Sequence, residues 1–250
     1  MSQVRKYLND HELLALSKNK ILVEGLQGLV KLDRSVALSE GVKLRIGSVI
    51  TGNSIIGPSS DLGLAGGAII ESSQLGQDAA VTGGGKIFYS VAGPHLRNYG
   101  SQLRHSKVGA NFVIRSMAET KNLVSGNNCK LKMFSRAYHS EIGDNNTIGS
   151  HSLVAGSQMG DGNLIGDYSS IENCQIGDKV KIGNYVHVRG SSSESSTVIE
   201  DNCQLGDHVV VHAGTRLFSG TKIPDYALVF TRNGKTVMSV IDMDETLENS

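Results

Sequence analysis

Residues 142–158 read IGDNNTIGSHSLVAGSQ, residues 159–175 read MGDGNLIGDYSSIENCQ, and residues 176–192 read IGDKVKIGNYVHVRGSS. Aligned, these segments share one 17-residue period. Three further copies precede them, starting at Val91, Val108 and Ser125. A fixed period of this length is typical of a solenoid, in which each coil contacts only its neighbours. We therefore expect functional sites on the outer faces or between subunits, and not in a central cleft.

A shorter period lies inside each copy, where aliphatic residues recur six positions apart, as at Ile142, Ile148 and Val154. After a break the same phase continues at Ile199, Leu205, Val211, Leu217, Ile223 and Val229. Three six-residue faces make one triangular coil with the aliphatic side chains inside. Glycine often follows the aliphatic residue, as at Gly149, and we expect it at a corner because glycine adopts positive φ without a steric penalty. A 17-residue copy predicts one corner that is one residue shorter than in an 18-residue coil.

This hexapeptide pattern resembles the hexapeptide-repeat transferase superfamily over roughly residues 30–230. The resemblance implies an all-β fold, a left-handed parallel β-helix solenoid with 17–18-residue coils. The left hand is implied by the resemblance alone, since crossovers between parallel strands are usually right-handed. We expect an N-terminal helical cap over residues 1–20, in which Asn9 and Glu12 form a capping box. The β-helix would cover residues 21–235, and residues 236–250 would form a tail.

Two segments depart from the regular repeat. Residues 21–90 carry an irregular version, and their GGGK run at 83–86 lacks both the spacing and the following helix of a phosphate-binding loop. Val188 and Ile199 stand eleven positions apart instead of six, which predicts a flexible loop over Gly190–Ser196. The resemblance implies that such a loop covers the active site of a neighbouring subunit, and a plain surface insertion is the alternative.

Composition narrows the function classes. The 250 residues carry a formal net charge of zero and show no basic stripe, which argues against binding to nucleic acid or an anionic membrane. No stretch approaches a membrane-spanning length, and the N-terminus lacks an apolar signal core. The three cysteines are scattered without metal-type spacing, so we expect a reduced, cytoplasmic protein.

The resemblance also implies a reaction. Acyltransferases of this fold use one histidine as a general base, in the groove between two subunits of a homotrimer. The histidine takes a proton from a hydroxyl or amine as that group attacks an acyl thioester. Acetyl-CoA or another acyl-CoA would then be the cosubstrate, with no bound cofactor, and the acceptor would be a small, sugar-like molecule.

Among the eight histidines, His139 is the preferred catalytic candidate. It ends a segment without glycine corners, residues 130–138, and stands just before the most regular coil. His105, Asn122 and His139 would form a polar column, which could line a groove that binds the substrate. We expect His105, Asn122, Arg136 and Tyr138 to bind substrate. The alternative is that all of them are solvated corner residues.

A more specific likeness covers a shorter segment. Residues 119–149 are similar to the acetyltransferase half of bacterial bifunctional sugar nucleotidyltransferases. The matching residues are Glu119, Lys121, Asn122, Lys130 and the Ile142-Gly143 pair. The catalytic histidine of that family falls on Met133, whose thioether cannot act as a base. Either that activity is absent or the base has moved to His139.

Two other functions use the same fold. A γ-class carbonic anhydrase needs three histidines on one zinc ion. His212 can match one of them, but its partner falls on Asp207, with His208 one residue away, so we expect no metal site. The column of Asp144, Asp161 and Asp178 could bind a cation, although corner aspartates usually bond their own backbone. The alternative to an enzyme is a non-catalytic scaffold, or a binding protein similar to a nucleotidyltransferase tail.

Overall fold

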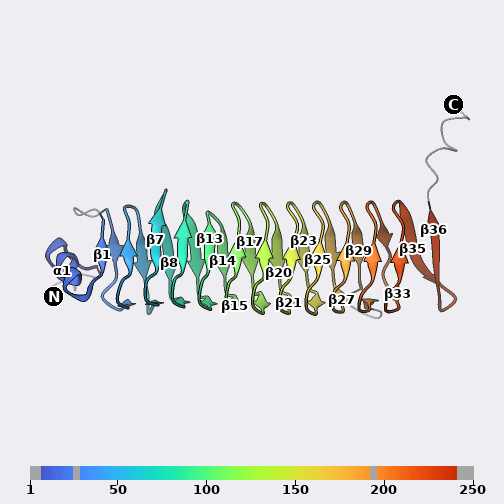
Figure 1. Cartoon of the computed structure of the whole chain (residues 1–250), viewed down its shortest axis with the longest axis horizontal. Helices are drawn as coiled ribbons and strands as arrows, with labels where there is room; N and C mark the ends of the chain where they lie inside the picture. Colours follow the sequence, from blue (N-terminus) through green and yellow to red (C-terminus); the bar gives the residue numbers. More distant parts are fainter. Residues whose placement is uncertain (1–6, 25–28, 192–195, 241–250) are drawn as a thin grey trace, which may run out of the picture. The chain divides into compact units, whose positions relative to one another are not determined.

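The computed structural model of the chain describes residues 7–24, 29–191 and 196–240. These residues form two compact units, Met1–Lys130 and Leu131–Ser250. In each unit the chain winds as a parallel β-solenoid, and each coil contributes short strands to three sheets (Figure 1). The all-β solenoid predicted from the hexapeptide period is therefore confirmed.

Unit 1 begins with the short helix α1 (Asp10–Ala15) and a 3-10 turn, η1 (Leu16–Asn19). The Asn9 side chain accepts a hydrogen bond from the Glu12 amide at 3.0 Å, and the Glu12 carboxylate accepts one from the Asn9 amide at 2.8 Å. This reciprocal pair is the predicted capping box, which satisfies two amides that a helix start leaves without partners. Leu13 is only 2% exposed and provides the buried contact of the helix.

Three parallel sheets make up the rest of unit 1. The first contains β1 (Leu22–Val23), β4 (Lys43–Leu44), β7 (Asp61–Leu64), β10 (Ala80–Thr82), β13 (Arg97–Tyr99) and β16 (Val113–Ile114). The second contains β2 (Lys31–Leu32), β5 (Val49–Thr51), β8 (Ala68–Glu71), β11 (Gly85–Phe88), β14 (Gln102–Arg104) and β17 (Glu119–Lys121). The third contains β3 (Ala37–Leu38), β6 (Ile55–Ile56), β9 (Gln74–Leu75), β12 (Val91–Ala92), β15 (Lys107–Val108) and β18 (Val124–Ser125). Strand β19 (Lys130–Leu131) falls at the division between the units.

Unit 2 has the same three sheets. The first contains β22 (Thr147–Ile148), β25 (Leu164–Ile165), β28 (Lys181–Ile182), β31 (Gln204–Leu205) and β34 (Lys222–Ile223). The second contains β20 (Arg136–Tyr138), β23 (Leu153–Ala155), β26 (Ser170–Glu172), β29 (His187–Arg189), β32 (Val210–Val211), β35 (Ala227–Arg232) and β36 (Lys235–Val240). The third contains β21 (Glu141–Ile142), β24 (Gln158–Met159), β27 (Cys174–Ile176), β30 (Thr197–Ile199) and β33 (Arg216–Leu217). Strand β36 pairs with β35 in the antiparallel direction and carries regular structure past residue 235.

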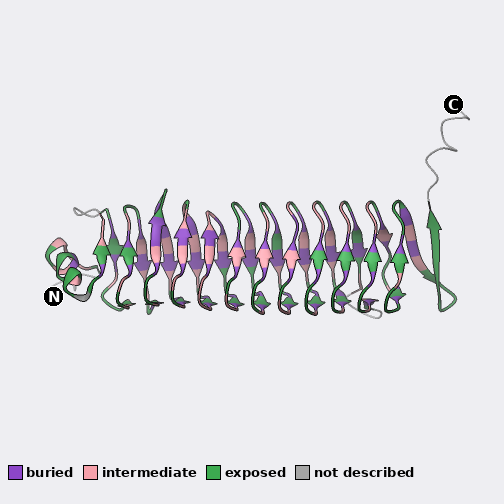
Figure 2. Cartoon of the chain, in the orientation of Figure 1, coloured by how far each residue is buried: buried purple, intermediate pink, exposed green. Residues whose placement is uncertain are grey.

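In unit 2, residues paired on neighbouring strands are 17 positions apart, which equals the period of the sequence. Ile148 lies opposite Ile165, and Ile165 lies opposite Ile182. The aliphatic residues of the hexapeptides are buried, while the residues beside them on the strands face outward (Figure 2). The coil that follows Ile182 is longer. Asn184 and Asp207 occupy equivalent positions in successive coils and are hydrogen-bonded, but they are 23 residues apart. The loop predicted over Gly190–Ser196 falls mainly on residues 192–195, which lie outside the described residues.

The first 17-residue copy was assigned one residue too early. Ala92, and not Val91, lies opposite Val108, and the Val91 side chain points outward with 43% exposure. Arg97 pairs with Val113, but Gln102 pairs with Glu119. The corner between β13 and β14 is therefore one residue shorter than the corner between β16 and β17. This coil is one residue shorter than the repeat, and the sequence register slips by the same amount.

In unit 2 the glycines that follow inward aliphatic residues do not adopt positive φ, which corrects the expectation from the sequence, whereas Gly63, which follows the buried Leu62 in unit 1, has a φ of 98°. Gly149, Gly160 and Gly177 all lack a positive φ. A Cβ at Gly149 would overlap the backbone of Gly166 in the next coil, and one at Gly160 would overlap the carboxylate of Asp178. Glycine is needed here because stacked coils approach each other too closely for any side chain.

The aspartates after these glycines bond between coils. The amide of Asp144 donates to Asp161 Oδ1 at 2.7 Å, and the amide of Asp161 donates to Asp178 Oδ1 at 2.8 Å. Each of these two carboxylates thus accepts a hydrogen bond from the preceding coil. The usual corner arrangement, in which the aspartate bonds its own backbone, was expected from the sequence. The Ile-Gly-Asp motif is therefore a device for stacking, in which glycine makes room for the aspartate of the following coil.

The residues with positive φ form separate columns at the corners. One column in unit 2 is aromatic and contains Phe134, His151, Tyr168, Tyr185, His208 and Tyr226. The rings stack along this corner with centroid separations of 4.7–5.1 Å and interplanar angles of 2–12°. Bulky residues rarely adopt this conformation, which costs about 1–3 kcal/mol. Stacking, which contributes about 0.5–1.5 kcal/mol for each pair, offsets that cost.

The glycine–aspartate pairing predicts a coupled effect on stability. We expect Gly160→Ala to lower the free energy of unfolding by about 1–3 kcal/mol, because its Cβ meets the Asp178 carboxylate. In an Asp178→Ala background the same substitution should cost clearly less, because that carboxylate is absent. Urea unfolding of the four proteins measures this coupling. Equal costs in both backgrounds would contradict the proposed role of glycine.

The aromatic column predicts a second effect on stability. Tyr185 stacks against both Tyr168 and His208. We expect Tyr185→Ala to lower the free energy of unfolding by about 1–3 kcal/mol, because two stacking contacts are lost. Tyr185→Phe is the matched control and should stay within about 0.5 kcal/mol of the wild type. If alanine and phenylalanine behaved alike in urea unfolding, the stacking would not stabilise the corner.

Candidate functional site

The predicted catalytic residue, His139, lies at a corner immediately after strand β20. It has a φ of 51°, and the equivalent positions of the next two coils are Gly156, with a φ of 59°, and Asn173, with a φ of 54°. Backbone hydrogen bonds fix this stacking: the Gly156 amide donates to Tyr138 at 3.0 Å, and the Asn173 amide donates to Ala155 at 2.9 Å. The middle position of the column therefore has no side chain between the imidazole and the Asn173 amide group.

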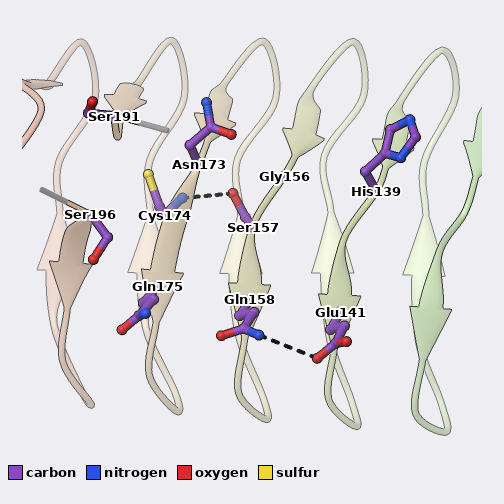
Figure 3. A pocket seen from close by; sticks show the side chains of 10 residues that line it. All are labelled: His139, Glu141, Gly156, Ser157, Gln158, Asn173, Cys174, Gln175, Ser191 and Ser196. Carbon is purple, nitrogen blue, oxygen red and sulfur yellow. Dashed lines mark hydrogen bonds between the residues drawn. The ribbon is translucent and has the colours of Figure 1, made fainter. Parts of the chain in front are cut away.

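A cavity of about 430 Å³ opens at this gap (Figure 3). Its lining residues are His139, Glu141, Gly156, Ser157, Gln158, Asn173, Cys174, Gln175, Ser191 and Ser196. Glu141, Gln158 and Gln175 form one row on the adjoining strands, because the register places them opposite one another. The Gln158 amide group donates to Glu141 Oε2 at 3.5 Å. The cavity therefore offers hydroxyl, amide and carboxylate groups beside one imidazole.

Two potential nucleophiles in the cavity are held inactive. Burial raises the pKa of the Cys174 thiol to about 12, so the thiol is neutral near pH 7. The same thiol donates to the Glu172 carbonyl at 2.9 Å. The Ser157 hydroxyl accepts from the Cys174 amide at 3.1 Å and donates to the Ala155 carbonyl at 2.9 Å. The thiol also reaches the Val188 carbonyl of the next coil at 3.7 Å, so both side chains are engaged with backbone groups.

The predicted substrate-binding residues are not gathered at this cavity. Arg136 and Tyr138 alternate with buried Ala137 on β20, and neither lines the cavity. His105 and Asn122 occupy neighbouring coils at one corner of unit 1, both with positive φ. The His105 ring stacks on Tyr89 with centroids 5.1 Å apart, which gives it a structural contact.

The residues of the alternative sequence motifs lie outside the His139 cavity. Met133, which aligns with the catalytic histidine of the nucleotidyltransferases, is 50% exposed and lies outside the cavity. His208 is held between Tyr185 and Tyr226 in the aromatic column, while His212 is part of a different surface. Over residues 7–24, 29–191 and 196–240, no group of three or more His, Cys, Asp or Glu side chains could hold a metal ion. No helix in the described part of the chain is long and apolar enough to cross a membrane.

Sequence reasoning missed most of the lining residues. Glu141, Gln158 and Gln175 stand just before inward aliphatic residues, in positions that look like ordinary solvated strand residues. The signal that could have found them is the 17-residue column itself. Reading His139, Gly156 and Asn173 as one column would have shown a missing side chain beside the histidine.

Residues 156–190 match the family described as bacterial transferase hexapeptide (six repeats). The matched segment supplies six cavity residues: Gly156, Ser157, Gln158, Asn173, Cys174 and Gln175. Comparison with curated proteins finds no match.

Several solved structures are similar to this chain. The polySia-specific acetyltransferase NeuO has 16% identity and a TM-score of 0.42, over 68% of this chain and 88% of that chain. An Arabidopsis UDP-N-acetylglucosamine acyltransferase has 18% identity and a TM-score of 0.32, over 92% and 75% of the two chains. The UDP-N-acetylglucosamine acyltransferase from Campylobacter jejuni has 14% identity and a TM-score of 0.35, over 90% and 78%.

At these identities and TM-scores the similarities identify neither a substrate nor a reaction. The family match and the coil register of the structure agree over the same segment. The chain is therefore a hexapeptide-repeat β-solenoid protein that carries the bacterial transferase hexapeptide repeat over residues 156–190.

Proposed function

We propose that the protein is an acyltransferase whose reaction takes place in the His139 cavity. The observation that carries the proposal is the gap at Gly156, which places open space beside a corner imidazole. The amide and hydroxyl groups around this space suit an acceptor that is rich in hydroxyl groups, such as a sugar. The hexapeptide transferase match covers the same wall of the cavity.

His139 would act as the general base. Its imidazole takes the proton from a hydroxyl or amine of the acceptor as that oxygen or nitrogen attacks the thioester carbonyl of an acyl-CoA. The tetrahedral intermediate then collapses, the carbon–sulfur bond breaks, and the imidazolium returns its proton to the leaving thiolate. The acyl group ends on the acceptor, and free CoA is released.

The other lining residues support this choice of base. The Ser157 hydroxyl accepts a hydrogen bond from the Cys174 amide, and burial raises the pKa of the Cys174 thiol to about 12, which favours the protonated thiol over the thiolate at neutral pH. Glu141 is the one carboxylate among the lining residues that the structure describes, and it accepts a hydrogen bond from Gln158. Histidine is the side chain whose ordinary pKa lies closest to neutrality, which suits both proton transfers.

Other features stay predictions that belong to the same proposal. These are the acyl-CoA donor, the sugar-like acceptor, a homotrimer and a cytoplasmic location. The binding roles predicted for His105, Asn122, Arg136 and Tyr138 also stay predictions, since none of the four lines the cavity. A non-catalytic scaffold is the alternative, and it predicts neither CoA binding nor turnover.

The test of the base uses His139→Asn, because asparagine tolerates positive φ, as at Asn173. With acetyl-CoA as donor and a panel of amino-sugar nucleotides as acceptors, we expect kcat to fall by about 10²–10⁴-fold. Release of the CoA thiol measures the rate. Acetyl-CoA should still raise the melting temperature of this variant, because binding does not need the base.

A matched control is His95→Asn, which replaces another corner histidine with a φ of 62°. We expect this control to keep wild-type turnover. If both variants kept full activity, His139 would not be the base. If the wild-type protein showed neither turnover nor a thermal shift at millimolar acetyl-CoA, the scaffold alternative would replace the acyltransferase.

Filling the gap gives an independent test of the cavity. Gly156→Asn places a side chain between His139 and Asn173 in a conformation that asparagine tolerates. The added Cβ would overlap Asn173 Oδ1, so the Asn173 amide group must turn away and we expect the melting temperature to fall somewhat. We expect acyl transfer to fall at least about tenfold, because the new side chain fills the cavity. The control is Gly162→Asn, at a corner glycine where a Cβ meets only Lys179 Cγ at 3.5 Å. Full activity in Gly156→Asn would place the reaction elsewhere.

A further inference from the structure

A second cavity lies on the outer face of the second sheet of unit 2. Its volume is about 300 Å³, and its lining residues are His187, Arg189, Val210, Val211 and His212. On β29, His187 and Arg189 flank the buried Val188, so both side chains point outward. His187 pairs with Val210 and Val188 with Val211, which brings His212 beside Arg189.

The three basic side chains of this cavity have no polar partner among the residues that the structure describes. Within the described residues, no hydrogen bond or ion pair involves the side chain of His187, Arg189 or His212. The hydrogen bonds of these residues are made by their backbone: the Arg189 carbonyl accepts from the Thr197 hydroxyl, and the His212 amide donates to the Val229 carbonyl. The donors therefore converge on the cavity without a protein acceptor.

The neighbouring carboxylate does not neutralise this cluster. Glu172 on β26 lies opposite Arg189 in the register, but it makes no ion pair with it. Its carboxylate instead accepts from the Ser170 hydroxyl at 2.7 Å. The described lining of the cavity contains no acidic residue. A guanidinium and two imidazoles beside two valines are thus available to an anion that enters from solvent.

The donor set favours a phosphate over a carboxylate. The guanidinium of arginine presents a planar fork that fits two phosphate oxygens, and each imidazole adds a separate N–H donor. A carboxylate has only two oxygens to accept hydrogen bonds from these three side chains, whereas a phosphate has three or more. The volume is also larger than one phosphate ion needs, so a diphosphate or a phosphate ester with part of its alcohol fits better.

We infer that His187, Arg189 and His212 form a binding site for a phosphate-bearing ligand, separate from the His139 cavity. Arg189 holds two oxygens of the phosphate through its guanidinium, His187 and His212 donate to the remaining oxygens, and Val210 contacts the apolar part of the ligand. The inference does not depend on acyl transfer, because binding at this site can be measured without turnover.

The test is calorimetric titration of the whole chain at fixed ionic strength, with inorganic pyrophosphate and with ADP. We expect both to bind the wild-type protein. Arg189→Gln should weaken the affinity for pyrophosphate at least about tenfold. Arg189→Lys should lose less, since it keeps the charge but not the fork. Lys181→Gln, which removes an exposed charge from another sheet of unit 2, should bind as the wild type does.

The outcomes are distinct. Equal affinities for pyrophosphate and ADP identify a free diphosphate as sufficient, and tighter ADP binding identifies a nucleotide-type ester; both support the site. Binding of ADP without pyrophosphate overturns it, because the nucleoside would then be recognised. Unchanged affinity in Arg189→Gln, an equal loss in Lys181→Gln, or no heat at millimolar pyrophosphate also overturns it. Circular dichroism confirms that each variant is folded.

Discussion

The structure depends on one constraint, the in-register stacking of equivalent residues in successive coils. Parallel strands hold the coils at a spacing of about 4.8 Å, so each residue must be compatible with its own equivalent one coil away. This rule explains the glycine of the Ile-Gly-Asp motif, whose missing Cβ leaves room for the next aspartate. It also explains the aromatic corner, where rings that would strain a single turn stabilise one another in a stack.

The same constraint determines how a site can arise. A solenoid of regular columns has no deep cleft, so a cavity needs an interruption in a column. At the His139 corner the interruption is the absence of a side chain at Gly156, and the polar rows beside it become the walls. At the outer face of β29 and β32, small valines lie beside long basic side chains and leave a hollow. Both cavities therefore lie where neighbours in a column differ, and the His139 cavity is also lined by Ser191 and Ser196 of the insertion that follows β29.

The sequence predicted the fold well because the hexapeptide period directly encodes which residues face inward. The aliphatic interior, the Asn9–Glu12 capping box and the solenoid are all confirmed. The period does not encode the distance between coils, and the expected reason for the glycines was therefore wrong in unit 2. It also misses the coil that is one residue short, because the inward residue before the shorter corner is the polar Asn98, which interrupts the aliphatic pattern there. For the candidate site, His139 was selected from its position and stays a prediction. Gln158 and Gln175 were missed, because the sequence was not read along the column in which Gly156 carries no side chain.

The antiparallel strand β36 has a consequence for assembly. The last coil of a parallel solenoid offers a row of unpaired backbone groups, on which a further coil from another molecule could stack. In the second sheet of unit 2 that row on β35 is occupied by β36, which runs in the opposite direction from Lys235 to Val240. A strand of reversed direction breaks the translational repeat, so an incoming coil can no longer continue the columns of glycine, aspartate and stacked rings. In this sheet the hairpin therefore occupies the edge on which a further parallel coil would have to stack.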